Sequence, residues 1–334
     1  MDLAVKGQMI AHRLLDRVIR DQRVSHAYLF EGPAGVGKEA TAIDFIILAM
    51  DILDTPLLRR RIADGTHPDV QILRPDGANV RIDQIRTLRK EMQSRPVEGG
   101  RKAFIITDAD RMTLEAANSL LKVLEEPPAY GLIVLLTSNL EQLLPTIRSR
   151  CQIIPFRALP KALIEQMLVQ DIGVTAADAA LIASLSEGLP GRARDMAESS
   201  GFQERRKTVL DDFDKIRLGT YKDVVTLIRG YEKAQDVPER LRLWSTIIRD
   251  ILIWKMTQHI EYLYHPDLVD TYRDASRQWS EYRLIIFLEK LDNAHRLLDN
   301  NINTGLVIQQ TMSELENLIR QEEDTYGKSR RSSV

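Results

Sequence analysis

The residues best suited to chemistry lie between positions 31 and 40, in the segment EGPAGVGKEA. Gly32, Gly35, Gly37 and Lys38 stand at the spacing of a phosphate loop, in which glycines let backbone amides curl around an anion. The N-terminus of the following helix adds favourable partial charge, and the lysine reaches the outer phosphates. We therefore expect a nucleotide-binding loop here; the plainer alternative is a glycine-rich turn with an exposed lysine.

The residue after the lysine departs from the phosphate-loop pattern. Where Ser or Thr would offer a neutral hydroxyl to magnesium, the chain has Glu39. At about 4 Å and an effective dielectric of about 20, each pair of like charges between this carboxylate and a polyphosphate costs about 4 kcal/mol. Thr41 cannot take over, because two residues along a helix rotate a side chain by about 200°. Either ATP or ADP binds weakly, or Glu39 turns to solvent and the pocket binds nucleotide without metal.

A second departure follows the apolar run KAFII, where a nucleotide hydrolase carries an acidic pair. One register puts Thr107 in place of the magnesium-orienting aspartate and Asp108 in place of the catalytic glutamate. The other register puts Asp108 and Ala109 there, so half of the pair is missing either way. Asp108 and Asp110 could instead cap the loop that follows the strand. Two changes in the same machinery predict a chain without efficient ATP hydrolysis of its own.

Residues 1–158 alternate short apolar runs with helical patterns, which favours an α/β domain with a parallel five-stranded sheet and helices on both faces. We expect buried strands at residues 27–30, 69–73, 102–107, 132–137 and 152–156. Helices are expected at residues 37–50, 82–93 and 113–126; the last stops before Pro127, because the residue before a proline is pushed out of helical geometry. The phosphate loop then lies between a strand and a helix, the context that this motif needs.

The remainder of the chain lacks strand patterns. Residues 159–202 carry three short helical patterns separated by glycine and proline, which predicts a small helical domain. Residues 203–323 are helical throughout, with apolar residues spaced by three and four, and predict an all-α domain. Residues 324–334 are polar and basic and predict a disordered tail.

The composition narrows the possible functions. Lys and Arg number 46 against 48 Asp and Glu, so the chain has no global attraction to nucleic acid or anionic lipid, and any DNA contact needs a local basic face. The longest apolar runs, such as FIILAM, are too short to cross a bilayer and no signal peptide is evident, so we expect a cytoplasmic protein without membrane contact. The single cysteine, Cys151, can form no internal disulfide and no cysteine-rich zinc site.

Six segments of the first 200 residues follow one another in a characteristic order: SHAYLFEGPAGVGK, HPDV, RIDQIRTLRKEM, ADRMTLEAANSLLKVLEEPP, LLTSN and LLPTIRSRC. In order and spacing this series closely resembles the AAA+ subunits of the bacterial clamp loader, and most closely those of the delta-prime type. The resemblance implies an AAA+ phosphate-loop domain, a lid and a helical collar that joins subunits into a ring. The helical remainder matches the family only in length and character.

The resemblance also implies a function in DNA replication with DNA polymerase III. The family forms a five-membered assembly that opens the sliding clamp and places it on primed DNA, with ATP used by gamma or tau subunits. Members of the delta-prime type often carry degraded nucleotide sites and act as a stator. The expected partners are therefore gamma/tau and delta subunits, with the sliding clamp and primed DNA reached through the complex.

A role for Arg150 follows from the resemblance, because Ser149-Arg150-Cys151 matches the SRC motif of the family. A guanidinium forks onto phosphate oxygens, and an arginine that reaches into a neighbouring site accelerates phosphoryl transfer by about 10³ to 10⁵. Arg150 would thus act in trans on ATP bound to the adjacent gamma subunit. The plainer interpretation makes Arg148 and Arg150 surface residues paired with carboxylates.

Other family positions carry over less firmly. Thr137, Ser138 and Asn139 stand at the strand end where the family senses the outer phosphate, or they only cap the loop. Arg192 lies where these proteins place a second phosphate-sensing arginine. Many members insert a zinc module of four cysteines before HPDV, but residues 51–66 contain no cysteine, so neither zinc nor another metal is expected.

DNA contact could come from one helix. Arg86 and Lys90 are four residues apart in RIDQIRTLRK and share a helical face, which is either a DNA-facing surface or an ordinary solvated one. Two main hypotheses remain for the function: a non-hydrolysing clamp-loader subunit that lends Arg150 to a neighbour, or an ATP-hydrolysing motor subunit of the gamma/tau type. A stand-alone AAA+ protein is a third alternative.

Overall fold

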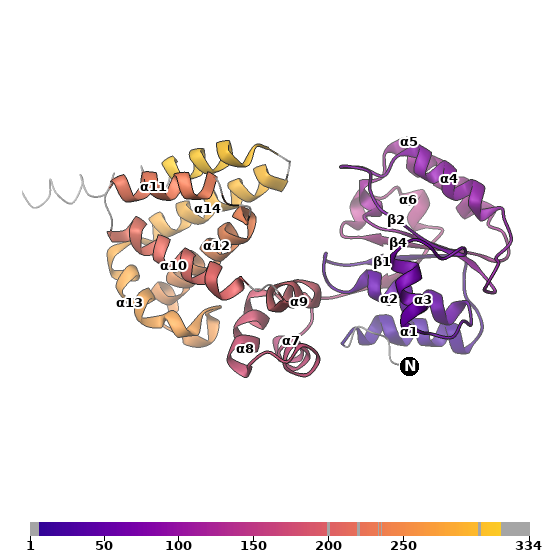
Figure 1. Ribbon diagram of the computed structural model, residues 1–334, viewed down its shortest axis with the longest axis horizontal. Helices are drawn as coiled ribbons and strands as arrows, with labels where there is room; N and C mark the ends of the chain where they lie inside the picture. The colour runs from indigo at the N-terminus through magenta and orange to yellow at the C-terminus, as the bar shows by residue number, and fades with distance from the viewer. Residues whose placement is uncertain are drawn as a thin grey trace, which may run out of the picture. The chain divides into compact units, whose positions relative to one another are not determined.

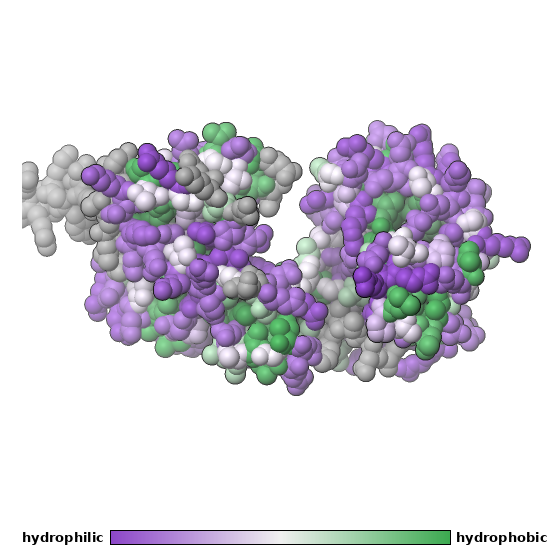
Figure 2. Space-filling model, in the orientation of Figure 1, coloured by the Kyte–Doolittle hydropathy of each residue, from purple (hydrophilic) through white to green (hydrophobic). Residues whose placement is uncertain are grey.

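The computed structural model describes residues 7–198, 201–218, 221–232, 234, 236–299 and 302–314 of the 334-residue chain (Figure 1). The chain divides into two compact units, Met1–Asp195 and Met196–Val334. The expected tail at residues 324–334 lies outside the described residues. On the face shown in Figure 2, hydrophilic side chains predominate over both units and are interrupted by smaller hydrophobic patches.

A five-stranded sheet organises the first unit. Its strands run in the order β2-β3-β4-β1-β5, and every neighbouring pair is parallel. Most of these strands are buried on both faces, which explains their near-continuous apolar sequences. All five expected strands are confirmed: β1 (Ala27–Glu31), β2 (Val70–Leu73), β3 (Lys102–Ile106), β4 (Gly131–Thr137) and β5 (Gln152–Pro155).

Helices cover both faces of this sheet, as the sequence predicts (Figure 1). One face packs against α1 (Met9–Arg20), α2 (Lys38–Ala49) and α3 (Pro56–Ala63). The other face packs against α4 (Ile82–Met92), α5 (Leu114–Glu125) and α6 (Pro145–Arg148). The expected helices at residues 37–50, 82–93 and 113–126 are confirmed, whereas the patterns considered above did not identify α1 and α3.

Three short helices follow the sheet within residues 159–198. They are α7 (Lys161–Met167), which continues as a π-helical turn at Leu168–Ile172, α8 (Ala176–Leu185) and α9 (Pro190–Glu198). Gly188 has φ of +78° and joins this region to the end of the sheet through a hydrogen bond from Leu159 N to its carbonyl oxygen. The helical character is as expected, and the proposed lid boundaries at 159 and 202 stay a prediction.

The described part of the second unit is helical. The longest helix, α12 (Val237–Thr257), packs against α10 (Phe202–Leu218), α13 (Val269–Gln278) and α14 (Glu281–Asp299), and α11 (Tyr221–Glu232) packs on α10. Trp244 on α12 stacks on Phe287 of α14 at 5.8 Å between ring centroids, at the centre of the core. No described helix is long and apolar enough to cross a membrane.

Candidate functional site

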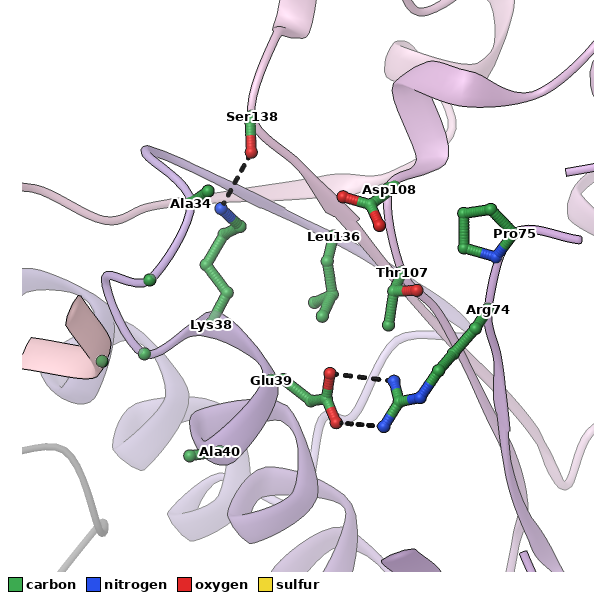
Figure 3. A pocket seen from close by; sticks show the side chains of 13 residues that line it. Ala34, Lys38, Glu39, Ala40, Arg74, Pro75, Thr107, Asp108, Leu136 and Ser138 are labelled. Carbon is green, nitrogen blue, oxygen red and sulfur yellow. Dashed lines mark hydrogen bonds and ion pairs between the residues drawn. The ribbon is translucent and has the colours of Figure 1, made fainter. Parts of the chain in front are cut away.

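A cavity of about 420 Å³ lies beside the phosphate loop, at the carboxyl ends of the strands (Figure 3). Its volume is in the range of small-molecule sites. Its position is where open α/β sheets bind ligands, because parallel strands all end at the same edge. The lining residues are Ala34, Gly35, Gly37, Lys38, Glu39, Ala40, Arg74, Pro75, Thr107, Asp108, Leu136, Ser138 and Gly191.

The loop backbone requires glycine at its three key positions. Gly32, Gly35 and Gly37 have φ of +153°, +76° and +101°, a region that L side chains rarely adopt. A Cβ atom at Gly32 would also collide with the carbonyl oxygen of Phe156. Gly37 caps the N-terminus of α2, so the first amides of this helix follow the loop directly. The loop geometry expected from the sequence is present.

Lys38 points into the loop rather than to solvent. Its side chain is 8% exposed, and Nζ donates to the carbonyl oxygens of Gly32 and, at 2.8 Å, Pro33. Ser138 Oγ lies 3.5 Å from the same nitrogen. Burial lowers the pKa of Lys38 to about 8, although the carboxylates of Asp110 and Asp108 act in the opposite direction. The lysine is therefore held at the loop by backbone oxygens that a phosphate group could replace.

Glu39 is paired with a cation that sequence reasoning missed. Arg74, directly after β2, donates from both terminal nitrogens to the two Glu39 carboxylate oxygens, at 3.0 and 2.7 Å (Figure 3). This fork-to-fork arrangement is the strongest geometry for such a pair, and it raises the pKa of Arg74. Arg74 thus holds Glu39 at the cavity wall, so the carboxylate does not stand there as an unpaired negative charge. Weak nucleotide binding and nucleotide binding without metal both stay predictions.

The position after the lysine does not supply the hydroxyl that holds magnesium in a phosphate loop. Both Glu39 oxygens are engaged by Arg74. The Thr41 hydroxyl is buried and donates to the Gly37 carbonyl at 3.0 Å, so it is turned away as expected. The Thr107 hydroxyl lies 3.4 Å from the Leu73 carbonyl. Magnesium prefers an octahedral shell of oxygen ligands, and no free protein hydroxyl stands at the position after the lysine to provide one.

The acidic residues after β3 divide between the cavity and the neighbouring loop. Asp108 lines the cavity and adopts a left-handed backbone conformation with φ of +46°. Asp110 instead accepts hydrogen bonds from Thr137 Oγ1 at 2.8 Å and from Ser138 N at 3.2 Å. Asn139 caps the next turn by accepting from Glu141 N at 3.1 Å. Thr137 is absent from the cavity lining, and its hydroxyl holds two loops together.

The start of α9 reaches the phosphate loop. Gly191 N donates to the Gly35 carbonyl oxygen at 2.8 Å, and a Cβ atom at Gly191 would lie 3.0 Å from that oxygen. Gly191 therefore lines the cavity, a contact that the sequence did not reveal. Arg192, expected as a phosphate sensor, is not among the lining residues and pairs with Glu187 at 3.3 Å.

Arg150 lies outside the cavity, just after α6. Its side chain is 36% exposed, and Nη2 pairs with Glu125 Oε1 at 2.9 Å. Nη1 donates to the Thr146 carbonyl at 2.9 Å. The carboxylate pairing anticipated by the plainer interpretation is present. Cys151 beside it is partly buried, and burial raises the pKa of its thiol to about 12, which disfavours the thiolate form.

The two residues considered for DNA contact both lie on the exposed side of α4. Arg86 is exposed and pairs with Asp83 at 3.1 Å. Lys90 is exposed on the same helical face, one turn further along. Their shared face is as expected, and contact with DNA stays a prediction.

The chain is similar to several curated clamp-loader proteins. It is 38% identical over 205 residues to the delta' subunit of DNA polymerase III from Bacillus subtilis, covering 59% of this chain and 61% of that protein. It is 33% identical over 192 residues to the delta' subunit from Escherichia coli, covering 56% of each chain. To the gamma/tau subunit from Mycobacterium tuberculosis it is 32% identical over 170 residues, which is 29% of that protein. The matched region thus spans less than two thirds of each relative.

A solved structure and two family models complete the comparison. A gamma subunit-related protein of DNA polymerase III from Thermotoga maritima aligns with a TM-score of 0.50 and 21% identity over 92% of this chain and 99% of that chain, which supports the fold. The family model for "DNA polymerase III, delta subunit" matches residues 7–160, and that for "DNA polymerase III, delta subunit, C terminal" matches residues 200–317. Together these family models cover most of the chain. The chain therefore belongs to the delta-prime family of DNA polymerase III clamp-loader subunits.

Proposed function

We propose that this chain is a largely non-hydrolysing stator of the clamp loader, which helps to place the sliding clamp on primed DNA during replication in the cytoplasm. Its proposed partners are gamma/tau and delta subunits. The observation that carries the proposal is the Glu39–Arg74 pair, which stands where a hydrolysing subunit presents a hydroxyl to magnesium. A chain with this pair has no evident means to position the metal that phosphoryl transfer requires.

In this proposal Arg150 acts in trans, at ATP bound to a neighbouring gamma or tau subunit. Its pair with Glu125 joins two partly exposed side chains, 36% and 49% exposed, and such surface pairs contribute about 1 kcal/mol or less. The guanidinium can therefore exchange the carboxylate for phosphate oxygens at little cost. Contact with a transferring phosphoryl group stabilises the guanidinium position far more than the surface pair does, because an arginine there changes the rate of phosphoryl transfer by about 10³ to 10⁵.

The test uses a complex reconstituted with gamma-type and delta subunits. Arg150→Ala is expected to leave assembly intact, as measured by native mass, and to lower ATP turnover by about 10³ at the site that it serves. Arg148→Ala is the matched control, because it removes an arginine two residues away on α6. Unchanged turnover in an intact Arg150→Ala complex would refute the donated arginine.

A second measurement, made on the isolated chain, separates the stator from the motor hypothesis. The isolated chain, given ATP and magnesium, is expected to release no phosphate above the protein-free rate. Turnover that disappears in Lys38→Ala would overturn the stator proposal and identify an ATP-hydrolysing subunit of the gamma/tau type. The gamma/tau alternative has support in the intact loop and cavity, which is why this measurement is decisive.

A further inference from the structure

The misfit with magnesium points to a different way of holding a phosphate. The cavity keeps the phosphate loop and its lysine, and the position of the metal-binding hydroxyl is taken by a side chain that is itself clasped by a guanidinium. We propose that this cavity binds a nucleoside diphosphate or triphosphate without magnesium, with Arg74 supplying the positive charge that the metal supplies elsewhere. This proposal concerns binding in the isolated chain and does not depend on the role of Arg150.

Arg74 is held where such a role needs it. Its backbone carbonyl accepts from Gln84 Nε2 at 2.8 Å, and its guanidinium is fixed by the two bonds to Glu39. A guanidinium has five N–H donors, so Arg74 keeps free donors after it has bonded to both oxygens of the Glu39 carboxylate. The side chain is 53% exposed and lines the cavity. Arg74 can thus contact a phosphate oxygen and Glu39 at the same time.

Lys38 provides the second cation. Its ammonium group is held by the carbonyl oxygens of Gly32 and Pro33 and lies inside the cavity lining, so a phosphate oxygen can take over from these neutral acceptors. Lys38 and Arg74 are formally balanced by Glu39 and Asp108. Because these side-chain charges cancel, the net attraction for a phosphate comes from the backbone amides that follow the three loop glycines. We therefore expect the affinity for the nucleotide to be modest.

A metal ion would weaken this arrangement rather than complete it. To coordinate Glu39, a divalent cation must break two charge-assisted hydrogen bonds and then lie next to the Arg74 guanidinium. The divalent cation and the guanidinium would then repel each other strongly, because two positive charges would lie side by side in a partly enclosed cavity. The expected signature is the reverse of an ordinary phosphate-loop protein: binding should persist when magnesium is removed.

The experiment measures binding of fluorescently labelled ADP to the full chain, in excess EDTA and in excess magnesium. We expect the affinity in EDTA to equal or exceed the affinity in magnesium. Arg74→Ala should weaken binding in EDTA by about tenfold, the effect of losing one charge-assisted contact. Glu39→Gln should strengthen it, because the substitution removes a negative charge and releases the guanidinium. Arg95→Ala, which removes an exposed arginine outside the cavity, should have no effect.

A double substitution separates a direct contact from a merely structural one. In the Glu39→Gln background, Arg74→Ala leaves no unpaired carboxylate behind to repel the ligand. We expect this double variant still to bind more weakly than Glu39→Gln alone, because the contact between Arg74 and the phosphate is lost. Binding that requires magnesium, no binding in either condition, or an affinity in EDTA that is indifferent to Arg74→Ala would each overturn the proposal. None of these results bears on the arginine donated by the assembled complex, so the two proposals fail separately.

Discussion

Lys38 gives the phosphate loop a measurable pH dependence. Burial lowers its pKa from 10.5 to about 8, so the folded chain releases this proton before the unfolded chain does. Between about pH 8 and 10.5 the unfolded state holds more protons, and linkage makes the free energy of unfolding rise with pH across that window. We expect chemical denaturation of the wild type, measured against Lys38→Met, to show this rise.

The comparison with Lys38→Met removes the contributions of other lysines and of tyrosines, which titrate in the same range in both proteins. Below about pH 8 the difference in the free energy of unfolding between the two proteins should be constant, because Lys38 is then protonated in both states. A difference that stays constant up to pH 10.5 would show that the amine keeps its ordinary pKa and is solvated.

At the residue scale, the sequence predicts what is local and misses what is distant. Gly32, Gly35, Gly37 and Lys38 could be identified because the loop is one continuous segment whose spacing reflects its own backbone geometry. Arg74 could not, because it is 35 residues from Glu39 and only the fold brings the two together. The role of a hydroxyl group is equally ambiguous in a sequence, since a threonine can use the same oxygen to bind a ligand or to hydrogen-bond within a loop.

Among the elements, β2 is anchored by one buried carboxylate. Asp69, directly before this strand, is 1% exposed and accepts hydrogen bonds from the backbone amides of Val97, Glu98 and Gly99, at 2.6 to 3.2 Å. The Asp69 carbonyl also accepts from Ala103 N at the start of β3. The HPDV segment therefore ties the edge of the sheet to the loop that leads into β3.

Removing this carboxylate should loosen that edge of the sheet. Asp69→Ala leaves amides without a charged acceptor, and we expect the free energy of unfolding to fall by about 3 kcal/mol, as measured by urea denaturation. Asp69→Asn keeps one acceptor oxygen and should cost less than the alanine substitution. Equal losses for the two variants would mean that the amides are satisfied in some other way.

The strands and helices differ in how visible they are in the sequence. Central strands of a parallel sheet are buried on both faces, so β1, β3 and β4 appear as continuous apolar runs and were predicted to within about a residue or two. Helix α3 was not predicted, although Thr55 caps it by accepting from Leu58 N at 3.1 Å and Pro56 occupies its first turn. A capping pattern on an eight-residue helix is a weak signal beside a long apolar run.

At the scale of the whole molecule, the sequence predicts classes of structure better than boundaries. The change from strand patterns to purely helical ones after β5 reflects a real change of architecture. The boundary between the two compact units lies at Asp195, within α9, and the expected lid boundary at residue 202 stays a prediction. Helical periodicity reports which face of a helix is buried and does not report which neighbours bury it.

The two units should unfold separately, because each has a core of its own. The two clusters that sandwich the sheet contain only residues of Met1–Asp195, while all three tryptophans, at positions 244, 254 and 279, belong to the second unit. Tryptophan emission therefore reports only the second unit, whereas far-ultraviolet circular dichroism reports both. In urea, Asp69→Ala should shift part of the dichroism transition to lower denaturant and leave the emission midpoint unchanged. An emission midpoint that moves with this substitution would show that the chain unfolds as one cooperative body.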